Sequence, residues 1–175
     1  MIRIVTCFLL TICTFICKGQ QTDNFDNLTY RDKYRIIIDD ATKYPAEANF
    51  ADKYLKLTQM TITLADSLVA GMMRPYRDTS FLYLLNDAKT EKFFNAMKDM
   101  YSLAFQEIRD VKLDERLNAR LVEVVLSKNV KDSISKSLKG QSTIESLATL
   151  RELQTACLQL TDLVFDEIIQ RKNKR

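Results

Sequence analysis

The scarcity of glycine and proline is the feature that most limits what this chain can fold into. The sequence holds three glycines and two prolines in 175 residues. Sheet proteins need many tight turns, and such turns draw on Gly, Asn and Pro. No segment sustains the alternation of apolar and polar residues that is typical of a half-buried strand. The sequence therefore predicts few turns, long elements and an all-α protein.

Apolar residues recur at helical spacing in the first half of the chain. A first helix is expected from the N-cap Thr29, with Asp32 three residues later as in a capping box, up to Pro45. The same proline is suited to the first turn of a second helix over about 46–73. A third helix is expected over about 88–112.

Two further helices are expected in the second half. Asp114 is a suitable N-cap for one broken helix over 114–139, which Gly140 would close in a left-handed conformation. Ser142 and Glu145 form a second capping box and open the last helix, expected to reach Arg171.

These lengths predict a single domain. Four helices of about 25–29 residues and a shorter first helix favour an antiparallel four- to five-helix bundle. We expect a flexible N-terminus over 20–28, the helical bundle domain over 29–171 and a basic tail over 172–175, without an internal repeat or a second domain.

The first residues, MIRIVTCFLLTICTFICKGQQ, have the pattern of a targeting segment. Arg3 precedes an apolar run that is too short to cross a bilayer, which takes about 20 residues, but suits a secretory signal peptide. Small residues at Cys17 and Gly19 predict cleavage after Gly19, so that residues 1–19 are removed. The alternatives are an uncleaved anchor and a lipoprotein, although Ile12 and Ile16 precede the cysteines that would carry the lipid.

Export is therefore the expected fate of the chain. The Gly-Gln junction resembles the cleavage ends of exported proteins in some Gram-negative bacteria, which predicts a periplasmic or extracellular location. After cleavage Cys157 is the one remaining cysteine, so no internal disulfide can form and stability must come from packing. The positive and negative charges are then almost balanced, which gives no indication of a nucleic-acid partner.

The residues needed for common catalytic sites are missing. There is no histidine in the sequence, which excludes Ser-His-Asp and Cys-His catalysis and histidine-bound metals. Cys157 lies on an apolar helix stripe and is expected to be buried. The acidic pairs are adjacent in sequence and point about 100° apart on a helix. We therefore expect no catalytic residue, no metal and no cofactor.

Two basic regions are candidate contact sites. The connection after residue 73 contains residues suited to binding carboxylates, phosphates or a protein surface, with pinning of the loop to the bundle as the alternative: Arg74, Tyr76, Arg77 and Asp78. The C-terminal tail could contact lipid headgroups or an acidic partner, or only complement the helix dipole, through Arg171, Lys172, Lys174 and Arg175. Membrane contact is expected only through this tail.

The sequence favours an exported, non-catalytic helical protein that acts by protein–protein contact. Its partner would be another protein or a second copy bound through helix faces, for instance in an accessory component of a secretion or conjugation apparatus of the cell envelope. The alternative is a carrier of an apolar ligand held between helices, which needs a cavity of about 300–1,000 Å³. An enzyme would need carboxylates from separate helices to converge.

Overall fold

The computed structural model describes residues 28–73, 84, 87–108 and 113–174. Within these ranges the protein is all-helical and has no strand, which confirms the predicted class. The described residues form six helices in this order: α2 (Tyr30–Asp39), α3 (Pro45–Met72), α5 (Ala88–Glu107), α6 (Glu115–Val125), α7 (Val130–Leu138) and α8 (Thr143–Asn173).

Local capping signals set most of the helix starts. The Thr29 hydroxyl accepts a hydrogen bond from the Asp32 amide at 3.3 Å, and the Asp32 carboxylate accepts one from the Thr29 amide, so α2 begins with the predicted capping box. The same reciprocal pair at Ser142 and Glu145 opens α8. Pro45 is the first residue of α3, where its missing N–H is not needed.

The stretch predicted as one broken helix over 114–139 forms two separate helices. Asp114 caps α6 as predicted. The helix ends at Val125, and the chain starts again at Asn129, whose side chain accepts from the Asp132 amide at 2.8 Å. Gly140 then closes α7 with φ +77°, the left-handed conformation expected of it.

Three other predicted helix ends need correction. α2 ends at Asp39 rather than next to Pro45, and a turn over 40–43 separates it from α3. α5 ends at Glu107 rather than near Lys112, because Ile108 is already extended, with φ −114° and ψ 121°. α8 continues to Asn173, so the segment predicted as a tail from Lys172 onward is helical for two more residues.

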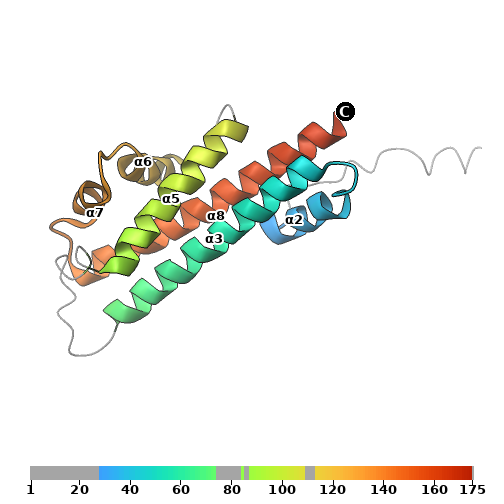
Figure 1. Ribbon diagram of the computed structural model, residues 1–175. Helices are drawn as coiled ribbons and strands as arrows, with labels where there is room; N and C mark the ends of the chain where they lie inside the picture. Colours follow the sequence, from blue (N-terminus) through green and yellow to red (C-terminus); the bar gives the residue numbers. More distant parts are fainter. Residues whose placement is uncertain (1–27, 74–83, 85–86, 109–112, 175) are drawn as a thin grey trace, which may run out of the picture.

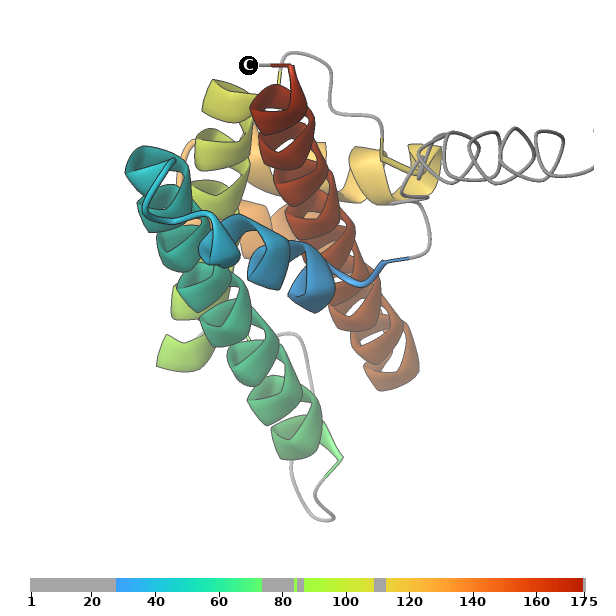
Figure 2. The ribbon, with the colours of Figure 1, turned by 90° about the vertical axis from the view of Figure 1, so that its right-hand side faces the viewer.

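Three long helices, α3, α5 and α8, pack alongside one another (Figure 1). α3 runs in the direction opposite to α5 and α8. The short helix α2 crosses α3 and α8, as Figure 2 shows. The helices α6 and α7 pack against α5 and α8.

Large side chains fill the space between the long helices. The Tyr54 hydroxyl donates to the Met100 carbonyl at 3.1 Å and thereby ties α3 to α5. The hydroxyls of Thr58 and Thr161 lie 2.9 Å apart and join α3 to α8. The largest fully buried apolar side chains are Tyr54, Phe93, Phe94, Phe165, Ile37, Leu68, Leu84, Met97, Met100, Leu121 and Ile134.

Among the described residues, no helix combines the length and the apolar character that crossing a bilayer would require.

Candidate functional site

Of the two candidate contact regions predicted from the sequence, the structure describes most of the C-terminal one and none of the other. Arg74, Tyr76, Arg77 and Asp78 lie outside the described residues, between the end of α3 and the start of α5. Their role in partner binding stays a prediction.

The C-terminal cations are partly engaged by the protein itself. Arg171 donates to Glu107 at 2.7 Å and to Glu167 at 2.9 Å. Lys172 is buried and pairs with Asp40 at 2.7 Å. Lys174 is exposed, and Arg175 lies outside the described residues. Of the three cations that the structure describes, two are therefore engaged in ion pairs within the protein and only Lys174 is exposed.

An open groove of about 480 Å³ runs between α3 and α5, which lie side by side in Figures 1 and 2. We call it the α3–α5 groove. Among the described residues, seven line it: Lys53, Lys56, Leu57 and Met60 of α3, and Asp99, Ser102 and Leu103 of α5. Several of these are four positions apart on the same helix, so they share one face of it.

The groove combines an apolar floor with charged edges. Leu57 and Leu103 are partly buried and pack against the core, whereas Met60 is 47% exposed. Lys53 on α3 and Asp99 on α5 are exposed at opposite edges. Apolar surface bordered by polar residues is typical of interaction sites, and methionine adapts to differently shaped partners.

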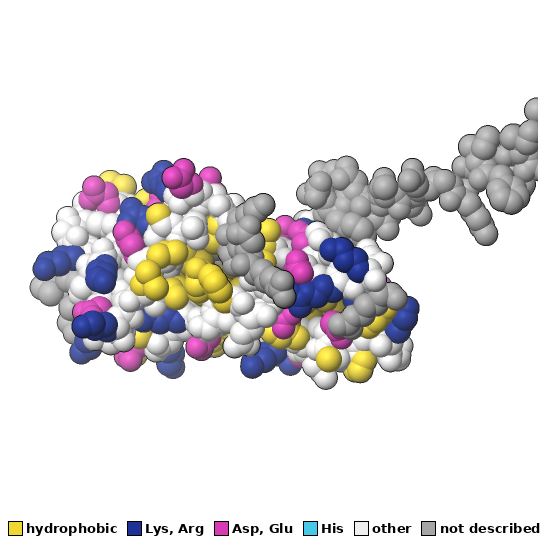
Figure 3. Space-filling view, turned by 90° about the horizontal axis from the view of Figure 1, so that it is seen from above, with side chains coloured by type: hydrophobic (Ala, Val, Ile, Leu, Met, Phe, Trp, Pro, Cys, Tyr) yellow, Lys and Arg dark blue, Asp and Glu magenta, His cyan; other side chains and the backbone are white. Residues whose placement is uncertain are grey.

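Other exposed apolar side chains are more scattered. Met73, Phe105, Leu126 and Ile144 are all more than half exposed, and they lie on or beside four different helices. Figure 3 also shows hydrophobic side chains gathered in the centre of the face seen from above. The α3–α5 groove brings Leu57, Met60 and Leu103 together from two helices.

A second hollow, of about 560 Å³, lies where the starts of α2 and α6 meet α8. Its polar groups already serve the fold. The Thr29 hydroxyl caps α2, and the Asp114 carboxylate accepts from the backbone amides that begin α6. Both groups are thereby committed to helix ends, so this hollow is the weaker candidate for a ligand.

Reactive groups are buried or dispersed. Cys157 is completely buried, as predicted, and burial raises the pKa of its thiol to about 12. Burial likewise raises the pKa of the Tyr54 hydroxyl. Within the described residues, no three acidic or cysteine side chains are placed to hold a metal ion. None of these groups forms a recognisable site for nucleophilic or acid–base chemistry.

Two buried lysines, one on each helix, form ion pairs between α2 and α8. We call this arrangement the lysine clamp. Lys33 of α2 is 1% exposed and donates to Asp162 and Asp166 of α8, each at 2.8 Å. Lys172 of α8 in turn pairs with Asp40 at the end of α2. Burial alone would lower the pKa of Lys33, but the hydrogen bonds to the two carboxylates and their negative charges together outweigh burial and raise it. The hydrogen bond from Lys172 lowers the pKa of Asp40.

The lysine clamp was not predicted, although the sequence carries a signal for it. Lys33 falls on the apolar face of its helix, three residues after Tyr30 and four before Ile37. Asp162 and Asp166 are four residues apart and therefore share one face of the last helix. A lysine among apolar positions, matched by two acids at helical spacing, indicates a buried ion pair.

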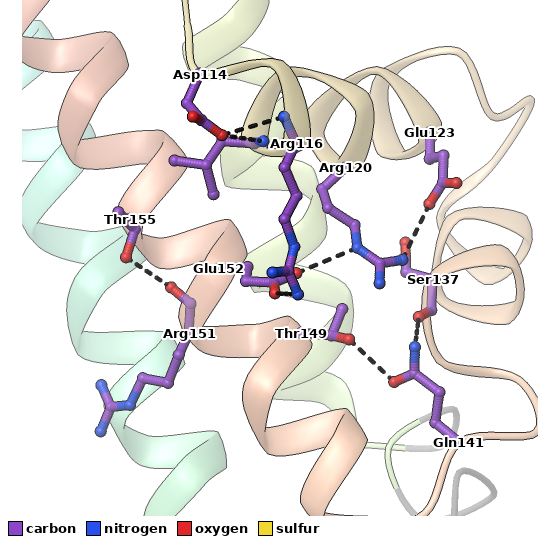
Figure 4. A network of polar contacts seen from close by, with 11 residues as sticks. Asp114, Arg116, Arg120, Glu123, Ser137, Gln141, Thr149, Arg151, Glu152 and Thr155 are labelled. Atoms are coloured by element: carbon purple, nitrogen blue, oxygen red, sulfur yellow. Dashed lines mark hydrogen bonds and ion pairs between the residues drawn. The ribbon is translucent and has the colours of Figure 1, made fainter.

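A polar network fastens α6 and α7 to α8 (Figure 4). Arg116 and Arg120 of α6 both pair with Glu152 of α8. After α7, the Gln141 side chain accepts a hydrogen bond from the Thr149 hydroxyl at 3.1 Å. These polar groups form hydrogen bonds and ion pairs with one another. We therefore interpret the network as stabilising the fold rather than as a binding site.

Comparison of the chain with protein-family models, curated proteins and solved structures gives no match. Any assignment of function therefore rests on the residues and the geometry described above.

Proposed function

We propose that this protein is exported, lacks catalytic activity and acts by protein–protein contact through the α3–α5 groove. The observation that carries the proposal is the exposure of Met60 beside the partly buried Leu57 and Leu103, in an open groove between two long helices. Such a groove is suited to receive a helix of a partner, because an amphipathic helix places its apolar side chains on one face.

Export is supported by the N-terminal pattern. We propose that a signal peptide is removed after Gly19 and that the remaining chain works in the periplasm or outside the cell as an antiparallel four- to five-helix bundle. The burial of Cys157 is compatible with an oxidising compartment, because the thiol is shielded from pairing. An accessory role in a cell-envelope assembly fits a protein of this kind.

The absence of catalysis is proposed on chemical grounds. The sequence has no histidine, which is the side chain most often used for proton transfer near neutral pH. The thiol of Cys157 is buried and its pKa is raised, so little thiolate forms at neutral pH.

Site-specific photocrosslinking in the native envelope tests the contact surface. A photoreactive residue in place of Met60 should capture a partner protein, whereas the same residue in place of Ile144, which is 79% exposed on α8, should not. Equal capture at both positions, or none at Met60, would contradict the groove assignment.

Mass spectrometry of the purified protein tests the export proposal separately. The expected N-terminus is Gln20. A chain that still begins at Met1, or one that begins at a lipidated Cys17, would overturn the cleavage proposal.

A second function, the carriage of an apolar ligand, is favoured by the size of the groove. Its volume of about 480 Å³ lies within the range of small-molecule sites, about 300–1,000 Å³. Native mass spectrometry of protein purified from the envelope would show a bound small molecule that the Met60→Asp variant loses. Because the groove is open along its length, we favour the protein partner.

A further inference from the structure

We propose that the α3–α5 groove binds a second copy of this chain across a twofold axis parallel to the groove. The inference rests on the proposed function, because it names the partner that the groove would receive. Symmetric dimers are the commonest assemblies of soluble proteins, and their interfaces must complement themselves. The α3–α5 groove meets that requirement through its charges.

Opposite charges line the two edges. Lys53 and Lys56 stand on α3, and Asp99 stands on α5. Lys56 bonds Asp52 of its own helix at 2.7 Å, in an exposed pair four residues apart. Lys53 and Asp99 are exposed, and neither forms an ion pair with another described residue. One edge is therefore positive and the other negative.

Two contacts between α3 and α5 show which residues of the two helices lie next to each other along the groove. The Tyr54 hydroxyl bonds the Met100 carbonyl at 3.1 Å, and the Lys89 ammonium bonds the Ser67 hydroxyl at 2.9 Å. Because α3 and α5 run in opposite directions, these contacts place Asp99 within about one helical turn of Lys56 along the groove. The positive and negative edges thus lie side by side rather than at opposite ends.

This distribution selects one symmetry axis. A twofold axis parallel to the helices places α3 of one copy over α5 of the other. Lys53 and Lys56 of each copy then face Asp99 of the other copy, so the same contact forms twice. An axis perpendicular to the helices places α3 over α3 and brings like charges together, which is unfavourable. In the first arrangement the leucines and Met60 of both grooves meet at the centre, where apolar contact stabilises association most.

The size of the face predicts a weak dimer. α5 has 20 residues and is about 30 Å long. With a width of two helices, about 20 Å, the face would bury about 600 Å² per copy, at the low end of specific interfaces. We therefore expect association at high protein concentration rather than a permanent dimer.

Charge reversal provides the test, because all three charged groups are exposed and their replacement leaves the core intact. Sedimentation equilibrium of the purified, processed protein, from about 1 μM to about 1 mM, should show a monomer–dimer equilibrium. The double variant K53E/K56E and the single variant D99K should each weaken dimerisation about tenfold or more. Reversal of the remote, exposed Lys131 to Glu is the matched control and should leave dimerisation unchanged.

Two complementary samples then test the pairing of opposite charges across the interface. The triple variant K53E/K56E/D99K should regain the homodimer, because its two edges are again opposite in charge. An equimolar mixture of K53E/K56E with D99K should form a heterodimer, because each variant then presents edges opposite in charge to those of the other. A dimer that is insensitive to reversal, or a mixture without heterodimer, overturns the proposed axis.

A wild-type protein that stays monomeric throughout the concentration range overturns self-association. That result leaves the proposed function standing, because photocrosslinking at Met60 reports a different partner in the groove independently of self-association.

Discussion

The lysine clamp makes a specific prediction about stability. In the Lys33→Met variant the side chain keeps most of its aliphatic length, so packing between α2 and α8 is nearly preserved. What disappears is the ammonium group and its two hydrogen bonds to Asp162 and Asp166, each 2.8 Å long. The variant therefore isolates the contribution of the charge.

The expected magnitude follows from the exposure of the partners. A hydrogen bond to a charged group contributes about 1.5–3 kcal/mol. Breaking a fully buried ion pair costs about 3–5 kcal/mol. Asp162 and Asp166 are 40% and 27% exposed, so water solvates them once the lysine is gone. We expect the free energy of unfolding to fall by about 1–3 kcal/mol, which lowers Tm by about 3–10 °C for a domain of this size.

Urea unfolding followed by far-ultraviolet circular dichroism measures this change, with an unchanged m-value as the sign that both states keep their compactness. Lys56→Met is the matched control, because Lys56 forms a similar pair with Asp52 but is 73% exposed. The control should lose less than about a third as much stability. A Lys33→Met protein as stable as the wild type would show that the hydrogen bonds do not outweigh the cost of burying the lysine.

The pKa of Lys33 adds a pH dependence to the same experiment. Its pKa is raised in the folded protein, so the folded state holds the proton more tightly than the unfolded state. The stabilisation is fully present below the pKa of a lysine in the unfolded chain, about 10.4. It is lost as the pH rises through the pKa of Lys33 in the folded protein. The difference in stability between wild type and Lys33→Met should therefore narrow as the pH rises through the alkaline range.

Two further predictions concern single positions. Because Cys157 is buried and the pKa of its thiol is raised to about 12, a disulfide reagent should modify it only at the rate of global unfolding; a fast phase in native buffer would contradict this. Gly140→Ala should lower the free energy of unfolding by about 1 kcal/mol in urea titrations, because φ is +77° although the space around its Cα is open. Gly140→Asn should lose less, since asparagine tolerates this conformation, and equal losses would argue against backbone strain.

The helix starts were predictable because they depend on neighbours in the sequence. The capping boxes at Thr29 and Ser142, the N-cap at Asp114 and the closing Gly140 each need only a few adjacent residues. The break between α6 and α7 depends on a longer-range contact. The Ser133 hydroxyl donates to the Val124 carbonyl at 2.9 Å, which ties the start of α7 back to the end of α6. That bond exists only after the chain has turned.

The groove was harder to predict than the core. Near-heptad spacing in the sequence favours an inward-facing stripe on this helix, formed by Phe50, Tyr54, Leu57, Leu64, Leu68 and Met72. In the structure, however, Leu57 is only partly buried and lines the α3–α5 groove. In the structure the buried face of α3 passes through Thr58 and Thr61 instead of Leu57. The hydroxyls of these two threonines donate to the carbonyls of Tyr54 and Leu57 one turn earlier, which satisfies their polar groups inside the protein. Sequence spacing alone does not show which part becomes exposed.

Ionic strength separates the two kinds of charge in this protein. Lys33 is buried with its partners close by, whereas Lys53 and Asp99 stand in solvent at the edges of the groove. At 1 M salt the Debye length falls to about 3 Å, so exposed charges across an interface are screened while a buried contact is screened much less. Self-association measured by sedimentation should therefore weaken with salt, whereas the stability lost in Lys33→Met should change little. If both respond to salt in parallel, the clamp is not shielded from solvent as its burial implies.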